Sequence, residues 1–450
     1  MARFLQSLRS VLGLRLPPPA SSSPPRPSFT RSGDCDYSIF REGDRAIIHA
    51  KVPYLTKPLK HGERTEVSRG VIHHDDIIGS RVWDPIKAHK GSLFRLSLPT
   101  LEEYVVYTPR LVTPIYGADA NLIVSLLDIH VLPPPSLPPA SDGATPLEIL
   151  EAGTGHGSLT LHLARAIHAA NTQPPPIPKN SQVRILANRP VRPYADAAET
   201  TSATAAARQE EQAENTEQKQ WDEWRAQRSA VIHTVDVSSK FSTHAEKTVR
   251  GFRRGLYAGN VDFHVGPVEE WIADQTRQRS SNNNKKAFLS YAILDMPSAH
   301  QRIPHVAPVL KRDGVLVVFM PSITQIGECV QLIAREKLPF VMDKVVELGT
   351  GLSSGRMWDV RVAVKKSRAD PSSWVESSRS EAADSSVSEE DGSSGSSTSS
   401  TSSEGPPEGP SEPAAEDNNV LVCRPKVGLK IVGGGFIGIW RRIEDRPQLV

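Results

Sequence analysis

Three glycines alternate with other residues in the segment 153–158, which reads Gly-Thr-Gly-His-Gly-Ser and follows an apolar run that ends at Glu151. Glycine permits a tight turn and lets a ligand approach the main chain closely. Apolar residues at helical spacing follow from Leu159 to Ile167. The pattern therefore predicts a strand, a glycine turn and a helix whose first N–H groups face a ligand.

The spacing of the glycines separates several kinds of site. A dinucleotide site requires G-x-G-x-x-G, and a phosphate-binding P-loop ends in Gly-Lys-Ser/Thr. The spacing here is G-x-G-x-G, the form seen in methyltransferases that use S-adenosyl-L-methionine (SAM). A glycine turn that only connects two elements is the alternative, because such a turn alone is a weak signal.

Two aspartates end later strands of the predicted sheet. Asp236 ends the strand predicted at Val231–Val237, and Asp295 follows the strand predicted at Phe288–Leu294. Ligands of open parallel sheets bind beyond the carboxyl ends of the strands, where one carboxylate can accept both ribose hydroxyls of a nucleoside. Either acid alone could be a turn residue. Their recurrence with the glycine turn predicts one shared site.

Alternating strands and helices surround these residues. Further strands are predicted at Val261–Val265, Gly314–Phe319 and Val341–Leu348, with helices at Thr243–Arg254 and Ile323–Glu336. The fold class is therefore α/β, a Rossmann-like methyltransferase domain over 111–365, with closing strands of the same sheet in 421–450. Residues 36–110 contain short strand patterns, Ile77–Ile78 among them, and predict a small β-rich N-terminal domain.

Three segments interrupt this pattern. Residues 1–33 hold five arginines and no acid, which is typical of a mitochondrial presequence, with a disordered tail as the alternative. The insertion 172–230 ends in a polar, helix-prone stretch that we expect to be partly helical and mobile. Residues 366–420 hold twelve acids against three bases and are rich in serine, so we expect a disordered linker.

The charge of the chain is +2, but the remainder, which we expect to fold, carries a surplus of about ten positive charges once these segments are set aside. A basic folded part suits a polyanionic partner. Exposed bases such as Arg81, Lys87, Lys90, Arg253 and Arg254 are candidates for phosphate contacts, although a solvated surface role is the commoner one. The three cysteines lie far apart, so no metal or disulfide framework is predicted. No apolar run approaches the length of a membrane span.

Several segments, in order, resemble the catalytic subunit of the tRNA (adenine-58-N1)-methyltransferase family. They are GVIHHDDIIGS at 70–80, TPIYGADANLI at 113–123, EAGTGHGSL at 151–159, LDMPSAH at 294–300, MPSITQI at 320–326, RMWDVRV at 356–362 and CRPKVGLKIVGGGF at 423–436. The resemblance implies a β-rich domain followed by a SAM-binding α/β domain. It also implies a homotetramer, or a heterotetramer with a non-catalytic paralogue, that acts on tRNA.

The resemblance also implies roles for individual residues. Asp236 would hold the ribose of SAM. Asp295 would border the SAM site, contact the target adenine and be the catalytic residue. The methionine part of SAM would be held by Gly153, Thr154, Gly155, His156, Gly157 and Ser158. Pro267 stands where the family has an acid near the adenine of SAM, so adenine recognition is expected from backbone groups around Val268 or from Glu269.

Two further departures lie on the target side of the site. The closing strands read Gly433-Gly434-Gly435 where the family has Gly-His-Thr-Gly, and Pro114 replaces a glutamine. We therefore expect SAM-dependent methylation of N1 of adenine 58 in tRNA, in mitochondria or alternatively in the nucleus. A non-catalytic RNA-binding partner subunit on the same fold, and a methyltransferase for another substrate, remain the alternatives.

Overall fold

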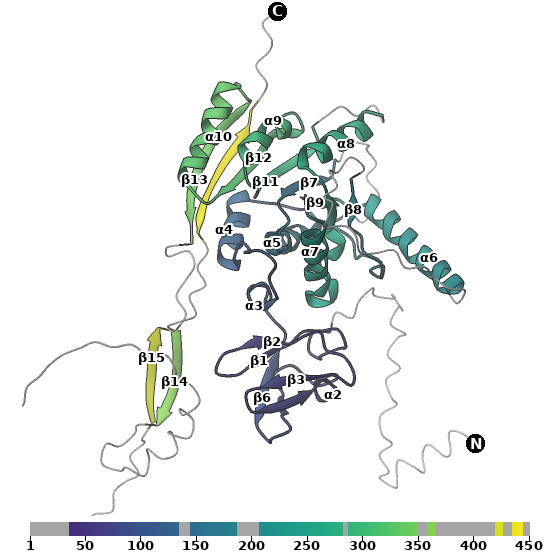
Figure 1. Ribbon diagram of the computed structural model, residues 1–450, viewed down its shortest axis with the longest axis vertical. Coiled ribbons are helices and arrows are strands. Elements are labelled where there is room, and N and C mark those ends of the chain that lie inside the picture. Colours follow the sequence, from purple (N-terminus) through teal and green to yellow (C-terminus); the bar gives the residue numbers. More distant parts are fainter. Residues whose placement is uncertain are drawn as a thin grey trace, which may run out of the picture. The chain divides into compact units, whose positions relative to one another are not determined.

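The computed structural model describes residues 36–134, 145–186, 207–281, 287–349, 358–364, 419–425 and 434–443 (Figure 1). The predicted presequence 1–33 and nearly all of the predicted linker 366–420 lie outside these ranges. Within them, no helix combines the length and the apolar character needed to cross a bilayer.

An eight-stranded sheet carries the larger part of the chain, in the order β13-β16-β12-β11-β7-β9-β10-β8. The six strands from β8 to β12 in this order are parallel, and β16 and β13 are antiparallel to their neighbours. The strands are β7 (Leu147–Ala152), β8 (Arg184–Ile185), β9 (Ala230–Asp236), β10 (Val261–Val265), β11 (Leu289–Leu294), β12 (Leu310–Met320), β13 (Phe340–Leu348) and β16 (Gly435–Arg442). The predicted Rossmann-like class is confirmed.

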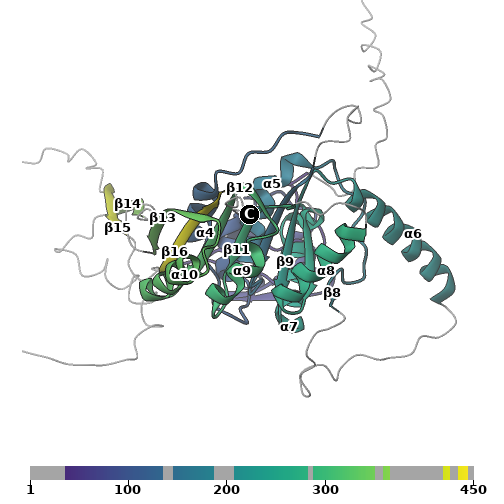
Figure 2. The ribbon, with the colours of Figure 1, turned by 90° about the horizontal axis from the view of Figure 1, so that it is seen from above.

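Helices pack on both faces of this sheet, because the central strands are apolar on both sides. Ile149 of β7 belongs to one core cluster and its neighbour Leu150 to the other. One face is covered by α3 (Leu101–Tyr107), α4 (Gly117–Leu127), α5 (Ser158–Ile167) and α7 (Ser239–Gly251). The other face is covered by α8 (Val268–Ser281), α9 (Ile303–Val306) and α10 (Ile323–Arg335), which line one side of the sheet in Figure 2.

Short helical turns complete the connections. They are the 3₁₀ turns η1 (His168–Ala170), η2 (Arg253–Gly255), η3 (Ala258–Asn260) and η4 (Ala299–Arg302). Helix α3 begins with a capping box, in which Thr100 and Glu103 satisfy each other's backbone N–H groups. This cap fixes the start of the connection between the N-terminal strands and the large sheet.

The N-terminal part is a small antiparallel sheet in the order β2-β1-β6-β5, with a separate hairpin β3-β4. Its elements are β1 (Ile47–His49), β2 (Tyr54–Leu55), β3 (Arg64–Val67), β4 (Gly70–His73), α2 (His74–Ile77), β5 (Pro85–Lys87) and β6 (Leu93–Ser97). The strand predicted at Ile77–Ile78 is wrong, because Ile77 ends α2 and is fully buried in the small core. Two apolar residues are too few to separate a helical from a strand period.

Arg254 ties the N-terminal part to the large sheet. Its guanidinium pairs with the buried carboxylate of Asp44 at 2.7 Å and also donates to the carbonyl oxygen of Ile39. Arg253 donates to the carbonyl oxygen of Pro99. The expectation that these two arginines contact phosphates is therefore wrong for Arg254, whose charge is already neutralised inside the protein.

The insertion 172–230 is anchored to the sheet at both ends. Near its start, β8 pairs in parallel with β10 and forms the edge of the sheet. Near its end lies α6 (Ala207–Ala226), where Trp221 is buried. The expected helical part of the insertion is confirmed by α6, which docks through one aromatic and two arginines although it has few apolar residues. The mobility of the insertion stays a prediction.

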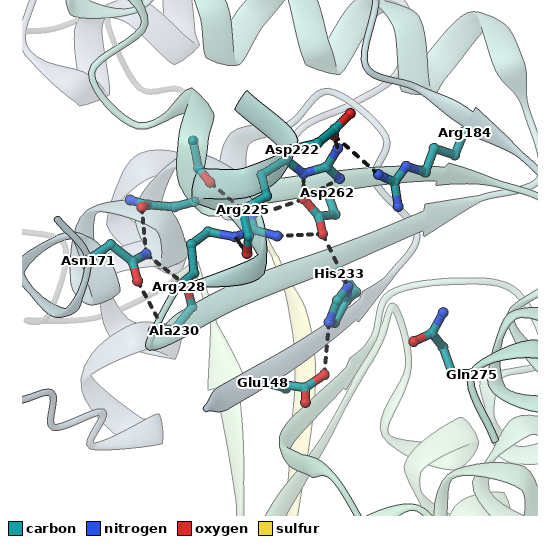
Figure 3. A network of polar contacts seen from close by, with 12 residues as sticks. Glu148, Asn171, Arg184, Asp222, Arg225, Arg228, Ala230, His233, Asp262 and Gln275 are labelled. Atoms are coloured by element: carbon teal, nitrogen blue, oxygen red, sulfur yellow. Dashed lines mark hydrogen bonds and ion pairs between the residues drawn. The ribbon is translucent and has the colours of Figure 1, made fainter. Parts of the chain in front are cut away.

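A buried network of charges fixes the end of the insertion (Figure 3). Arg225 and Arg228 pair with the carboxylate of Asp262 on β10 at 2.7 and 2.8 Å. Burial alone would raise the pKa of Asp262, but the charges of Arg228 and Arg225 outweigh it and hold that pKa below its usual range. His233 on β9 continues the network to Glu148 at 3.0 Å.

The C-terminal segment 421–450 divides between two sheets. β16 lies between β12 and β13 in the large sheet, whereas β15 (Asn419–Pro425) pairs along its length with β14 (Trp358–Val364) in a separate two-stranded sheet. The expectation that all of 421–450 closes the large sheet is therefore wrong for β15. A strand pattern in the sequence predicts that a segment forms a strand. It does not predict which other strand it pairs with, because the partner can lie far away in the chain.

Candidate functional site

A cavity of about 630 Å³ lies at the carboxyl ends of β7, β9 and β11. This volume suits a small organic ligand. Three carboxylates line it, those of Glu151, Asp236 and Asp295, each at the end of a different strand. The prediction that Asp236, Asp295 and the glycine turn share one site is therefore confirmed.

The glycine turn forms the floor of this cavity. Gly153, Gly155 and Gly157 all have positive φ, at +101°, +52° and +80°, a region that glycine adopts without steric cost. The N–H of Gly153 donates to the carbonyl oxygen of Val235 at 2.9 Å, and the N–H of Asp295 donates to that of Ala152 at 2.8 Å. These bonds continue the sheet ladder into the turn.

The remaining residues of the turn begin helix α5. Gly157 is the N-cap, and Ser158 donates its hydroxyl to the carbonyl oxygen of Ile115. Of the six turn residues expected to hold a ligand, five line the cavity. Gly157 is the exception, because it packs against α7, where a Cβ would lie 3.1 Å from that of Ala245.

His156 lines the cavity as a neutral ring. Burial, and then the nearby His244, lower the pKa of His156 to about 4. The two rings lie 5.3 Å apart, so the His156 ring packs against His244 of α7. The neutral imidazole therefore adds no charge to the cavity.

Asp236 is held in place by the main chain of its neighbours. Its two carboxylate oxygens accept N–H groups from Gly155 at 3.1 Å and Ser238 at 2.8 Å. Burial raises its pKa despite these two bonds. Since each carboxylate oxygen has a further lone pair, Asp236 can accept two more hydrogen bonds from a ligand.

Asp295 faces the cavity without a side-chain hydrogen bond from any described residue. Burial, and then the negative charge of Asp236, raise the pKa of Asp295 to about 7. A bound cation would lower this pKa again, because it favours the charged form. Asp295 is therefore a carboxylate poised to accept a hydrogen bond or a positive charge.

Glu151 is the cavity residue that sequence reasoning did not assign to the site. It is fully buried, accepts the hydroxyl of Thr160 at 2.6 Å, and its pKa is raised to about 8, chiefly by burial. Asp295 and Asp236 also raise it. An acid at the end of an apolar strand, directly before the glycine turn, was the available signal.

The expected adenine contacts are only partly found. Val268, the first residue of α8, lines the cavity, as does Gly266 before it. Glu269 does not line the cavity and instead pairs with Arg302 at 3.4 Å. Pro114 lies in the cavity wall, where Phe241 and Gln325 are further lining residues that the sequence did not single out.

Comparison with known proteins gives a consistent relationship. No family model matches the chain. The tRNA (adenine(58)-N(1))-methyltransferases TrmI from two strains of Thermus thermophilus are each 26% identical to it over 315 residues, which covers 70% of this chain and 86% of each relative. The chain is related in sequence to these tRNA methyltransferases. The aligned length spans most of both proteins, so the relationship is not confined to a nucleotide-binding turn.

Two solved structures align with most of this chain at low sequence identity. A SAM-dependent O-methyltransferase from Thermotoga maritima is 13% identical with a TM-score of 0.49, and covers 91% of this chain and 96% of its own. The tRNA (m1A58) methyltransferase TrmI from Aquifex aeolicus is 13% identical with a TM-score of 0.46. The alignment covers 90% of this chain and 100% of the Aquifex chain.

Proposed function

We propose that the chain is a SAM-dependent methyltransferase that methylates N1 of adenine 58 in tRNA. The observation that carries the proposal is the convergence of three acidic residues, Glu151, Asp236 and Asp295, with a glycine turn in one cavity, in a chain related over most of its length to tRNA methyltransferases. A cationic ligand suits this cavity, because a positive charge beside Asp236 and Asp295 would favour their carboxylate forms.

The residues of the cavity fit SAM. SAM supplies a methyl group on a positively charged sulfur, and its ammonium group is a second cation. The spare lone pairs of Asp236 suit the two ribose hydroxyls. Within the turn, the N–H groups of the three glycines are already hydrogen-bonded, so those of Thr154, His156 and Ser158 are the ones available to the methionine end. The main chain at Val268 is placed for the adenine.

Asp295 is the residue that we assign to the target base. Adenine N1 is unprotonated near neutral pH, so the enzyme needs no strong base and works chiefly by positioning the reactants. As N1 gains a methyl group, positive charge spreads over the adenine. The Asp295 carboxylate, accepting a hydrogen bond from the exocyclic amino group, stabilises that charge.

The deciding experiment is methyl transfer from labelled SAM to an unmodified tRNA transcript by the purified chain. The proposal expects label on wild-type transcript and none on a transcript with guanine at position 58. Asp295→Asn keeps the shape of the side chain and is expected to lose transfer. SAM binding with transfer to a different base or molecule would favour a methyltransferase for another substrate.

The alternative that this chain is a non-catalytic partner subunit predicts a different result. Such a subunit should bind tRNA but not SAM. The retained glycine turn and Asp295 speak against it, since a subunit without catalysis has no need of either. Calorimetric titration of the purified chain with SAM separates the two functions before any transfer assay.

We also propose that the chain works in mitochondria as a homotetramer. The support is the composition of residues 1–33, which matches a presequence, and the family resemblance, which implies a tetramer. A fluorescent protein fused behind residues 1–33 should enter mitochondria, and light scattering should give four times the mass of one chain. Nuclear fluorescence, or a tetramer formed only with a paralogue, would overturn this proposal.

A further inference from the structure

Trp83 is an exposed aromatic residue that does not line the cavity. Its side chain is 52% exposed, and it is the one aromatic among the large hydrophobic side chains that are exposed in the described residues. Tryptophan is enriched at surfaces that contact a partner, because its ring combines a large apolar area with a polar N–H. Nothing in the catalytic proposal above uses Trp83.

The indole of Trp83 is held rigidly. It stacks on the imidazole of His49, with ring centroids 4.6 Å apart and planes inclined by 21°. The His49 ring is fixed in turn by a 2.7 Å hydrogen bond between its Nε2 and the hydroxyl of Ser97. One face of the indole is therefore covered, and the rest of the side chain is open to solvent.

The main chain at Trp83 is also fixed, in a conformation that non-glycine residues rarely adopt. Its φ is +72°, in the left-handed region. Its N–H donates to the carbonyl oxygen of Leu96 at 2.7 Å, and its carbonyl oxygen accepts Arg95 Nη1 at 2.7 Å. Such a conformation persists only where surrounding contacts impose it, so β6 presents the indole in one orientation.

Basic side chains share the face of the small sheet on which Trp83 lies. Residues directly opposite in an antiparallel pair point to the same side. His49 is opposite Arg95, and Lys87 is opposite Leu93, on strands that adjoin one another. Arg95, Lys87 and Leu93 are all exposed. We call this exposed face, made of His49, Trp83, Lys87, Leu93 and Arg95, the aromatic face.

We propose that the aromatic face is a second RNA-binding site, on which Trp83 stacks an unpaired base of the tRNA while Lys87 and Arg95 contact the adjoining phosphates. The inference rests on the proposed function, because it takes tRNA as the substrate. A sheet face that combines an open aromatic ring with basic residues is a common arrangement for single-stranded nucleic acid.

The chemistry of the face favours RNA over a protein surface. Two of its five residues carry a full positive charge, Arg81 is exposed close by in sequence, and Asp84 is the acid beside Trp83. A protein-docking face is instead depleted of lysine at its centre. Because adenine 58 must be exposed for its N1 to react, the rearranged RNA also offers unpaired neighbours that need a stacking partner.

The test compares the affinity of full-length variants for an unmodified tRNA transcript, measured by filter binding without SAM. Trp83→Ala should weaken binding about five- to a hundredfold, the range for loss of one base–aromatic stack. Trp83→Phe keeps a ring and should retain most of the affinity. SAM affinity and melting temperature, measured on the same preparations, show that each variant is folded.

Lys87→Glu tests the phosphate contact. It should weaken binding and reduce the dependence of log affinity on log salt concentration by about one. Lys337→Glu, the same change of charge after α10 in the other domain, is the matched control and should have a smaller effect. Equal effects of both lysine changes would overturn a local phosphate contact.

Two results would overturn the stacking site. One is unchanged tRNA affinity in a folded Trp83→Ala variant. The other is a change in the mass of the assembly without a change in tRNA affinity, which would make the aromatic face a protein contact. Failure of the proposed function would give a different result. In that case the wild-type chain, with Trp83 intact, would not transfer a methyl group to tRNA.

Discussion

A Cβ atom placed on Gly153 would lie 1.8 Å from the carbonyl oxygen of Asp295. The first glycine of the turn and the candidate catalytic residue are therefore packed main chain against main chain. Gly153→Ala must push the ends of β7 and β11 apart, since φ at this position is also +101°. We expect it to abolish SAM binding and to lower the free energy of unfolding by about 3 kcal/mol.

Gly155→Ala is the matched control for that change. Its Cβ would meet nothing nearer than Val112 Cγ1 at 3.8 Å, and its φ of +52° is less extreme. Gly155→Ala should therefore lower SAM affinity and stability less than Gly153→Ala does. Calorimetric titration with SAM and thermal melts measure these two quantities. Equal losses of SAM affinity and melting temperature in both variants would show that the close approach to Asp295 is not what destabilises Gly153→Ala.

The raised pKa of Asp295 predicts a pH profile. The carboxylate form is the active one, and the pKa of about 7 places its formation near neutrality. The ratio kcat/KM for SAM should therefore rise with pH, with its midpoint near 7, and level off at higher pH. The profile of kcat should inflect at lower pH, because bound SAM favours the carboxylate.

Asp295→Asn should lower kcat by about 10²- to 10³-fold, the usual loss for a group that stabilises developing charge, and should leave no inflection near 7. Rates measured from pH 5.5 to 9 on both proteins test this. An inflection near 7 that persists in Asp295→Asn would assign that proton to another group.

Glu151 makes a prediction about stability. Its pKa is raised from 4.5 to about 8 by folding, so the folded state holds its proton more tightly than the unfolded chain. The stabilisation from this proton is complete below about pH 4.5 and is lost as pH rises towards 8. Without SAM, the melting temperature of the wild type should therefore fall relative to that of Glu151→Gln between these limits. Parallel curves over this range would contradict it.

A buried and an exposed arginine of the insertion, Arg228 and Arg184, should differ in how much their removal destabilises the protein. Arg228→Ala leaves the buried Asp262 with one partner fewer and should cost about 3 kcal/mol. Arg184→Ala removes a cation whose side chain is 57% exposed and 3.9 Å from Asp222, which should cost under about 1 kcal/mol. Urea denaturation of both variants decides, and similar losses would show that the network does not anchor the insertion.

The sequence predicted the parts of the fold that depend on local pattern. β10 has the predicted bounds, and β9, β11 and α10 differ from theirs by one or two residues. The grouping of Asp236 and Asp295 around the glycine turn was also predictable, because parallel strands end at one edge of the sheet.

The remainder depends on contacts between distant residues, which single-sequence patterns do not contain. The partner of β15, the docking of α6 through Arg225 and Arg228, and the pairing of Arg254 with Asp44 each join segments far apart in the chain. The sequence placed Glu151 before the glycine turn but did not assign it a role. Its raised pKa and its hydrogen bond with Thr160 follow from burial in the packed sheet.

Both ends of the insertion are pinned to β10, through the N–H of Leu186 on the carbonyl oxygen of Val265 and through Arg228 on Asp262. β10 therefore carries both attachments of the insertion, and a substitution that displaces this one strand should release β8 and the end of α6 together.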